Sequence, residues 1–444
     1  MIGSVLHIHN LFNDSIFLFQ IIILFQVIYW GIISYLKHNK TLINWHTLFL
    51  TCFVFFIASR PLFDLFGIGN LRQTEFFTSH VLNSSILSRT LLNVNLSLMF
   101  FFSSIFFFSF KKNPKIKVVS LKFHRYINIS LVLLSPFMLA FTMLKIQFII
   151  DYGYLAYHLG EERIPFQTIL KFISSIYIVL FTIILSSKII SKKIFWVSFV
   201  LLFLVFISDG RRGPALILIL VLMLNLQSLN NYKVRLTKLF IIVPIILAII
   251  IIVRSLRFNS SLDLDIISLL YGQGISLQTV SYAIEYESSI HYSLLNIVDS
   301  FFRTLSVLYN KIIGIENDLT LSSKVSEYKI YSTYLSYIVN SKLYFSGFGI
   351  GGSFISELFS IGREYVQVLG SFIIGFIFNR SINYNNSSNS VFLRAAYLLI
   401  LMSLVYIPRD NIFDFITDNI IGFLLLFLIQ IISNLKWKKE KLIL

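Results

Sequence analysis

The chain has 444 residues, of which 56% are hydrophobic, 16% are aromatic and only 13% are charged, and its mean hydropathy is +0.80. Soluble globular domains carry about a quarter charged residues, so this composition excludes a soluble enzyme. A membrane-spanning helix needs roughly 20 mostly apolar residues. The sequence therefore predicts an all-α polytopic membrane protein.

Charge and cysteine content exclude further classes of protein. The formal net charge is +16, but the cations are scattered between apolar segments, so we expect no nucleic acid as a partner. The single cysteine, Cys52, lies in an apolar run, which excludes a disulfide framework and a cysteine-based zinc site. The first apolar run has no basic region before it and no small-residue cleavage site after it, so we expect no cleaved signal peptide.

Apolar runs separated by polar breaks predict eleven spanning helices, and an odd number places the two termini on opposite sides of the membrane. The runs cover residues 15–36, 46–66, 87–110, 126–149, 167–187, 194–208, 213–229, 237–254, 347–379, 391–407 and 415–435. The run 194–208 is short for a span. The run 347–379 is long enough to be a broken helix, or a re-entrant piece followed by a span.

Lysine and arginine are concentrated in alternate breaks, as expected for short cytoplasmic loops. These breaks cover residues 37–40, 111–125, 188–193, 233–238, 380–394 and the tail 436–441. The bias predicts an N-terminus outside the cytoplasm and a C-terminus inside it. The predicted organisation is one membrane-embedded domain, with spans 1 to 8 in residues 1–254, a large extracytoplasmic loop in 255–346, and spans 9 to 11 with a basic cytoplasmic tail in 347–444.

The extracytoplasmic loop 255–346 is far longer than an ordinary connection, which is typical of functional or disordered loops. Helical spacing of apolar residues over 265–286 and 290–313 predicts short helices lying against the membrane surface. The loop holds ten of the 22 tyrosines of the chain. A tyrosine ring can stack on a sugar or lie at the level of the lipid headgroups, and the sequence leaves both open.

Arginines at the outer ends of spans are the strongest functional signal. Arg211 and Arg212 follow Asp209 and precede Pro214, which suits the first turn of a helix. Cations at a helix N-terminus oppose the helix dipole unless an anion is bound, and free N–H groups beside two guanidiniums form an anion site. The alternative is that both arginines anchor to lipid headgroups, with Asp209 as a local partner.

Two further outer positions carry arginine. Arg254 and Arg257 close the eighth span on one helix face, where the dipole favours cations, so a structural role is equally open. Arg409 follows Pro408 and precedes three aspartates at four-residue spacing, namely Asp410, Asp414 and Asp418. These aspartates could also form the acidic first turn of the last helix, with Arg409 paired to them.

The literal G-x-G-x-x-G of residues 347–352 lies at the mouth of a span rather than between a strand and a helix, so it does not indicate a dinucleotide site. Asp263 and Asp265 resemble a D-x-D sugar-transferase motif, but helix capping explains them better on the outer face. No P-loop and no H-E-x-x-H motif is present. We expect neither a cofactor nor a bound metal.

The motif order resembles the Wzy family of bacterial O-antigen and related polysaccharide polymerases. The residues that carry the resemblance are the G-x-R-G element at 210–213, the segment from Tyr271 to Ser276, the segment from Gly351 to Phe359 followed by Gly362, and Arg409. The first five spans match this family in hydropathy alone, and Arg211 beside Arg212 is an additional cation.

This resemblance implies a GT-C type glycosyltransferase in the bacterial cytoplasmic membrane that joins undecaprenyl-diphosphate-linked oligosaccharide repeat units on the outer face. A polysaccharide chain-length regulator is the partner that it implies. The diphosphate would be bound by Arg211, Arg212, Arg254, Arg257 and Arg409. The glycan would be bound by Tyr271, Gln273, Tyr331 and Tyr334.

The acceptor proton needs a base, for which the sequence offers Asp209, Glu357, Asp410 and His291 without ranking them. A lone histidine such as His291 is more often structural. A ligase that moves finished glycan from the lipid carrier to another acceptor is the alternative within the same class. A flippase or transporter is disfavoured because the charges gather at one face and no half-repeat is visible, and a structural scaffold would not explain arginines placed against the dipole.

Overall fold

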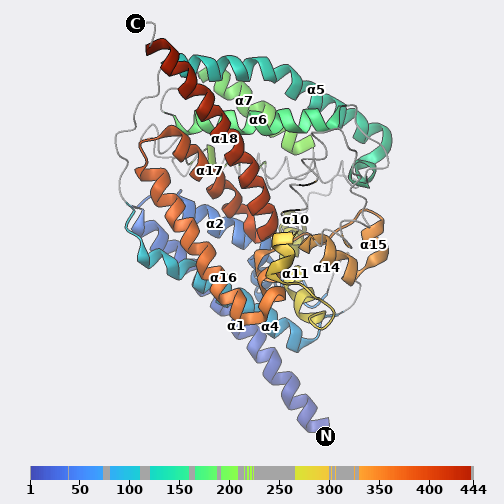
Figure 1. The fold of residues 1–444 in the computed structure, drawn as a ribbon. Helices are drawn as coiled ribbons and strands as arrows, with labels where there is room; N and C mark the ends of the chain where they lie inside the picture. The colour runs from blue at the N-terminus through green and yellow to red at the C-terminus, as the bar shows by residue number, and fades with distance from the viewer. Residues whose placement is uncertain are drawn as a thin grey trace. The chain divides into compact units, whose positions relative to one another are not determined.

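The structure, a computed structural model, describes most of the chain. The described residues are 2–38, 40–73, 81–110, 121–159, 166–187, 192–208, 215, 218–219, 221–222, 224, 266–299, 302, 306, 325 and 330–441. Among them the secondary structure is helical, apart from an isolated bridge between Gln73 and Val81 (Figure 1). The prediction of an all-α polytopic membrane protein is confirmed.

Seven helical segments of the described residues are long and apolar enough to cross a membrane. They are Ser15–Lys37, Trp45–Leu65, Ser84–Phe107, Phe123–Tyr152, Ile169–Ser186, Phe354–Ser387 and Val391–Arg409, and two shorter apolar helices cover Lys193–Ser208 and Asn419–Ile431. Each corresponds to a predicted span. The predicted span 237–254 lies outside the described residues, and only six residues of the predicted span 213–229 are described, so the total of eleven stays a prediction.

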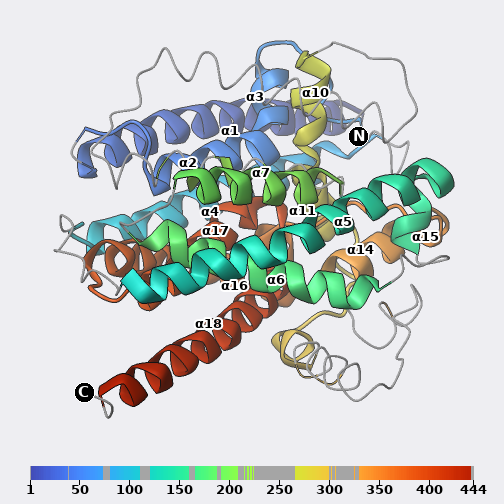
Figure 2. The same ribbon diagram turned by 90° about the horizontal axis from the view of Figure 1, so that it is seen from above.

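The chain divides into two compact units. Unit 1 comprises Met1–Phe108, Asp265–Asn379 and Leu404–Thr417, and unit 2 comprises Ser109–Leu264, Arg380–Ser403 and Asp418–Leu444. In unit 2, α5 (Leu121–Leu159), α6 (Gln167–Ser186) and α7 (Lys192–Ser208) lie side by side (Figure 2). The residues described below as the candidate site all belong to unit 1.

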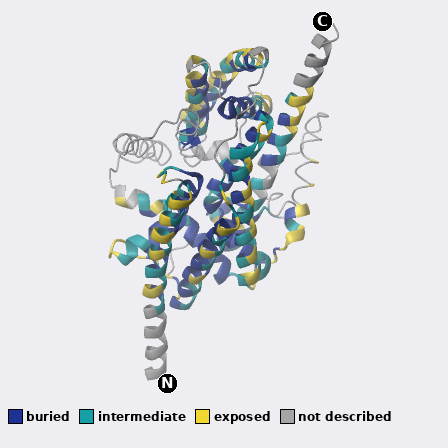
Figure 3. Ribbon diagram, turned by 90° about the vertical axis from the view of Figure 1, so that its left-hand side faces the viewer, coloured by how far each residue is buried: buried dark blue, intermediate teal, exposed yellow. Residues whose placement is uncertain are grey.

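Unit 1 is assembled around α1 (Ile2–Lys37) and α4 (Ser84–Ser103), which are packed against each other. Polar side chains join them: the Gln26 Nε2 donates to Asn95 Oδ1 over 3.1 Å, and the hydroxyls of Ser15 and Ser88 lie 2.8 Å apart. The outward face of α1 is apolar, since Phe17 and Phe25 are 57% and 66% exposed (Figure 3). Such a face suits contact with lipid.

The second span of unit 1 is built from α2 (Trp45–Phe53), the π-helical turn η1 (Val54–Ala58) and α3 (Ser59–Leu65). Asn44 is the N-cap of α2. Its side chain accepts a hydrogen bond from the Thr47 N–H, and the Thr47 side chain accepts one from the Asn44 N–H, which together form a capping box. The π-helical turn precedes Arg60, which α3 holds in the interior. Single π-helical turns inside α-helices are frequent at functional sites.

The long helix α16 (Phe354–Ser387) is broken at Gly362 and Arg363, where the backbone leaves helical geometry and Arg363 takes a φ of 55°. The ninth apolar run had two predicted forms, a broken helix or a re-entrant piece followed by a span, and the structure shows a break within it. C-terminal to the break, Gln367 Nε2 donates to the carbonyl oxygen of Asn93 and to Ser97 Oγ on α4, each over 2.7 Å. These bonds hold the part of α16 that follows the break against α4.

The loop helices are α10 (Ile266–Gln273), α11 (Ile275–Glu285), α14 (Tyr331–Val339) and α15 (Ser341–Phe345). The helical stretch expected over 265–286 is present as α10 and α11, whereas most of the stretch expected over 290–313 lies outside the described residues. One of these two helices differs from the expectation of a surface position: α11 is buried at every residue from Ser276 to Ile284 and is packed against α4 and η1. Small and hydroxylated residues make this possible, since the hydroxyls of Thr90 on α4 and Ser281 on α11 lie 3.2 Å apart.

Gly375 sets the approach of α16 to α4, because a Cβ added there would overlap the carbonyl oxygen of Phe101. We predict that Gly375→Ala lowers the free energy of unfolding by about 1–3 kcal/mol, the usual cost of overpacking. Thermal unfolding of the purified protein in detergent measures this. Gly31→Ala is the matched control, since its Cβ would make an ordinary contact of 3.8 Å with Leu50; equal melting temperatures for the two variants would contradict the prediction.

Two histidines link α1 to the base of α16. His38 Nε2 and His46 Nδ1 lie 2.8 Å apart, and His46 Nε2 lies 2.6 Å from Asn379 Oδ1. Since Asn379 Nδ2 donates to Ser104 Oγ over 2.7 Å, its oxygen is the acceptor from His46, and His46 Nδ1 accepts from His38. Burial lowers the pKa of His38 from 6.5 to about 4.

The unfolded chain therefore binds the His38 proton more readily than the folded chain does. The contribution of the neutral His38 side chain to the free energy of unfolding is complete above pH 6.5 and is lost as the pH falls from 6.5 toward about 4. We predict a melting temperature that decreases over this interval in the wild type, and decreases less steeply in His38→Gln. Thermal unfolding at a series of pH values measures the two slopes, and identical slopes would show that His38 does not contribute.

Candidate functional site

The turn between α10 and α11 is held by a buried arginine from α3. Arg60 Nε donates to the carbonyl oxygen of Tyr271 over 3.2 Å, and its guanidinium carbon lies 4.8 Å from the centre of the Tyr271 ring. Arg60 is 2% exposed. Gly274 permits the close approach, because a Cβ there would lie 2.7 Å from Arg60 Cγ. The glycine is therefore required by packing rather than by a phosphate-binding loop.

A second arginine reaches the same turn from the C-terminal end of the tenth predicted span. Arg409 ends the 3-10 helix η3 (Ile407–Arg409), and its Nη1 donates to Ser276 Oγ over 3.2 Å. Gly351, with a φ of 79°, lies against the guanidinium, so that an added Cβ would come within 3.3 Å of Arg409 Cζ. Arg409 is half-buried. Three sequence segments that the motif analysis singled out thus meet at this one side chain.

The carboxylate of Glu357 fixes the segment that carries Arg409. Glu357 is in the first turn of α16 and is fully buried. Its Oε2 accepts from the backbone N–H of Ile412 over 2.6 Å, and its Oε1 accepts from the Tyr292 hydroxyl over 3.2 Å. Ile412 is the first residue of α18 (Ile412–Lys441), so the carboxylate lies at two helix N-termini, where a negative charge is stabilised.

The residues between Arg409 and α18 are also held. Asp410 Oδ1 accepts from the Asn411 N–H over 2.9 Å, and Asp410 is half-buried. Asn411 is buried against Gly352, where an added Cβ would overlap the Asn411 side chain. The pair Gly351 and Gly352 therefore makes room for two successive elements of this site, the Arg409 guanidinium and the Asn411 amide.

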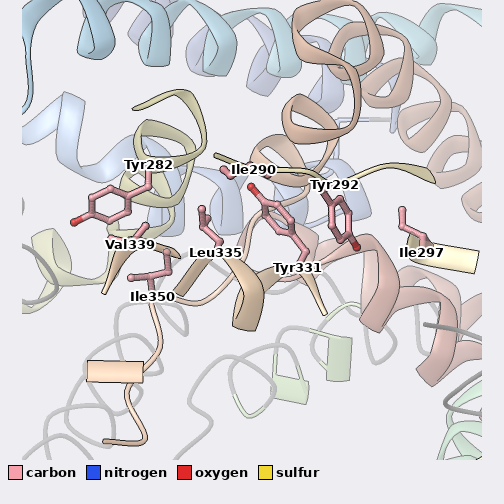
Figure 4. Close-up of a cluster of buried hydrophobic side chains, with 8 residues drawn as sticks. All are labelled: Tyr282, Ile290, Tyr292, Ile297, Tyr331, Leu335, Val339 and Ile350. Carbon is pink, nitrogen blue, oxygen red and sulfur yellow. The ribbon is translucent and has the colours of Figure 1, made fainter. Parts of the chain in front are cut away.

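Three tyrosines of the loop are buried in a core beside the site, whereas Tyr337 of the same loop is 39% exposed. Tyr282, Tyr292 and Tyr331 lie in one apolar cluster, with the Tyr292 and Tyr331 rings 5.1 Å apart (Figure 4). The Tyr331 hydroxyl donates to the carbonyl oxygen of Ser356 over 2.8 Å, next to Glu357. Burial raises the pKa of Tyr331 above its ordinary value of about 10, so this hydroxyl is neutral at physiological pH.

The predicted glycan-binding residues divide into two groups. Tyr271 and Tyr331 are enclosed, with 6% and 0% exposure, and pack against Arg60 and Tyr292 respectively. Gln273 and Tyr334 are half-buried and keep surface for a ligand. The Tyr334 hydroxyl accepts from the backbone N–H of His291 over 3.4 Å, and the side chain of His291 is exposed.

Five predicted residues lie outside the described residues: Asp209, Arg211, Arg212, Arg254 and Arg257. The structure brings together Arg409, Asp410 and Glu357 from the remaining set. Within the part of the chain that is described, no group of three or more histidine, cysteine, aspartate or glutamate side chains could hold a metal ion.

Sequence reasoning did not include Arg60, Ser276, Tyr292 or Asn411 among the site residues. Arg60 carried a usable signal, since a charged residue within an apolar run indicates a specific partner. Tyr292 and Asn411 carried no such signal, because their roles depend on contacts between segments far apart in the chain.

These features define a polytopic helical membrane protein whose loop helices and span ends together hold buried and half-buried arginines. The chain matches the family model described as O-antigen polysaccharide polymerase Wzy over residues 1–441. It therefore belongs to the Wzy family of O-antigen polymerases and is an inner-membrane protein. No curated protein and no solved structure matches the chain.

The Tyr292 hydroxyl donates a hydrogen bond to the buried Glu357 carboxylate. We predict that Tyr292→Phe lowers the free energy of unfolding by about 1–3 kcal/mol, since it leaves a buried carboxylate oxygen short of a donor. Thermal unfolding in detergent measures the change. Tyr337→Phe, at a ring that is 39% exposed, is the control with the same chemistry, and a Tyr292→Phe variant as stable as this control would contradict the role given to the bond.

Proposed function

We propose that this polymerase joins oligosaccharide repeat units carried on undecaprenyl diphosphate, on the outer face of the cytoplasmic membrane. The observation that carries the proposal is the placement of Arg409, which lies between Ser276 and Gly351 and is half-buried. A guanidinium in such a place is strongly attractive to a phosphate group. The diphosphate of the lipid carrier is the anion that this family's substrate would bring to it.

The reaction would be a glycosyl transfer. A hydroxyl oxygen of the incoming unit forms a bond to the anomeric carbon of the growing chain, and the bond from that carbon to the carrier diphosphate breaks. The diphosphate leaves with the electron pair, and the hydroxyl proton passes to a base. Since the leaving group is already a good one, the protein contributes chiefly by neutralising its developing charge and by positioning the acceptor.

Arg409 would bind the leaving diphosphate. Asp410 is the base that we favour among the described residues, because it is half-buried beside Arg409. Both oxygens of the Glu357 carboxylate already accept hydrogen bonds in the interior, so we assign Glu357 a positioning role. His291 is exposed and is the second choice of base. Asp209 stays a candidate of the same kind.

The remaining arginines, Arg211, Arg212, Arg254 and Arg257, are proposed as further diphosphate ligands, and Gln273 and Tyr334 as contacts for the glycan. We expect catalysis without a metal ion, since the arginines supply the positive charge that the leaving group needs. A chain-length regulator is the protein partner that we propose, by analogy with the family.

Removal of Arg409 tests this function. In a deletion strain complemented at matched membrane levels, we predict that Arg409→Ala lowers surface polymer about 100-fold or more, the usual effect of losing one donor to a developing negative charge. Single repeat units should accumulate. Arg409→Lys should be intermediate, because it keeps the charge and loses the two-pronged geometry.

Arg380→Ala is the matched control, since Arg380 is exposed and its side chain donates a hydrogen bond to the Tyr384 hydroxyl, which is not part of the site. The size distribution of surface glycan and of carrier-linked precursors gives the readout. Wild-type polymer length in Arg409→Ala would contradict the assignment. Full-length polymer retained on the carrier in the deletion strain would indicate a ligase, and precursors held on the cytoplasmic side would indicate a flippase.

A further inference from the structure

Another arginine, on the helix that precedes Arg409, is buried near the start of that helix. Arg394 is in the first turn of α17 (Val391–Tyr406) and is 3% exposed. Its Nε and Nη1 atoms are buried, and neither has a hydrogen-bond partner among the residues that the structure describes. Arginine has five N–H donors and remains charged, so it is normally paired when it is buried.

The position makes this charge still less favourable. The N-terminus of a helix carries partial positive charge, which a cation in the first turn opposes. A guanidinium without an anion is therefore disfavoured here for two separate reasons, burial and the helix dipole. One bound anion would remove both.

The surrounding backbone offers further donors for an anion. Ser390 accepts hydrogen bonds from two backbone N–H groups of the turn. Its Oγ accepts from Leu393 N over 3.4 Å, and its carbonyl oxygen accepts from Arg394 N over 3.0 Å. The N–H groups of Val391 and Phe392 precede the first intrahelical bond of α17. Side chains on a helix lean toward its N-terminus, which directs Arg394 toward this turn.

We propose that Arg394 and the N-terminus of α17 bind a phosphate group. The connection before α17 joins two segments long enough to span a membrane, Phe354–Ser387 and Val391–Arg409, so this turn lies at a membrane surface. Phosphate matches the forked guanidinium and the N–H groups of a helix terminus. The phosphate comes either from the headgroup of an anionic phospholipid or from a soluble phosphate compound. The proposal does not depend on the polymerase mechanism.

Purified full-length protein in a neutral detergent tests the site with three probes: phosphatidylglycerol, diacylglycerol and inorganic phosphate. The variant R394M removes the charge and keeps a side chain of similar length. In lipid-free detergent, R394M should melt at the same temperature as the wild type or above it, because an unpaired buried charge has been removed. Phosphatidylglycerol should raise the melting temperature of the wild type and not that of R394M.

Native mass spectrometry gives a second readout. R394M should retain phosphatidylglycerol about tenfold less tightly than the wild type, in line with the loss of a charge-assisted bond. R380M is the control, since Arg380 is in the same hairpin, is exposed and donates from Nη2 to the Tyr384 hydroxyl over 3.3 Å. It should behave as the wild type does, and diacylglycerol, which lacks the phosphate, should stabilise neither protein.

The arms distinguish the two sources of phosphate. Stabilisation of the wild type by phosphatidylglycerol alone indicates a lipid headgroup, and stabilisation by inorganic phosphate that R394M lacks indicates a soluble ligand. Equal responses of the wild type and R394M to both phosphate probes would overturn the proposal. If R394M does not fold, R394Q carries the same comparison, with the same outcome overturning it.

Discussion

The site depends on the hydrogen bonds that the buried carboxylate of Glu357 accepts. This carboxylate accepts from the first N–H group of α18 and from the Tyr292 hydroxyl, and it stands in the first turn of α16. A charge without exposed surface is tolerated only where donors and dipoles compensate it, and here two helix N-termini and a tyrosine do so. Because α18 begins three residues after Arg409, this bond also determines where that guanidinium lies.

Both arginines of the site contact the turn between α10 and α11 or its flanking residues, and so connect the loop to the spans. Arg60 holds the Tyr271 carbonyl from α3, and Arg409 holds the Ser276 hydroxyl from η3. A loop tied to two spans in this way is pre-organised, and pre-organised charges need not rearrange as a leaving group becomes negative. The burial of α11 against α4 has the same effect, since it makes part of the loop a component of the bundle.

The sequence predicted the spans well because a run of apolar residues is a local property. The break in α16 was also predictable, since residues 347–379 are too many for one straight crossing, and the structure places the break at Gly362 and Arg363. Only the family resemblance of their segments indicated that Ser276, Gly351 and Arg409 belong to one site. Hydropathy alone could not show that these three residues contact one another.

Burial within the loop is what the sequence could not decide. A tyrosine suits a sugar, a headgroup or a protein core, and only long-range packing placed Tyr331 against Tyr292 and away from the surface. Glu357 posed the same difficulty, since a carboxylate near a span can be a base or a structural ligand. Its two hydrogen bonds, to Ile412 and Tyr292, join segments that lie more than fifty residues away in each direction.

The most direct measurement is the dissociation constant of undecaprenyl diphosphate for the purified protein, in the wild type, Arg409→Ala, Glu357→Gln and Arg380→Ala. The account predicts that Arg409→Ala weakens binding about tenfold or more, that Glu357→Gln weakens it through the displaced guanidinium while remaining folded, and that Arg380→Ala leaves it unchanged. Equal dissociation constants for all four proteins would contradict the claim that Glu357 positions Arg409 to bind the diphosphate.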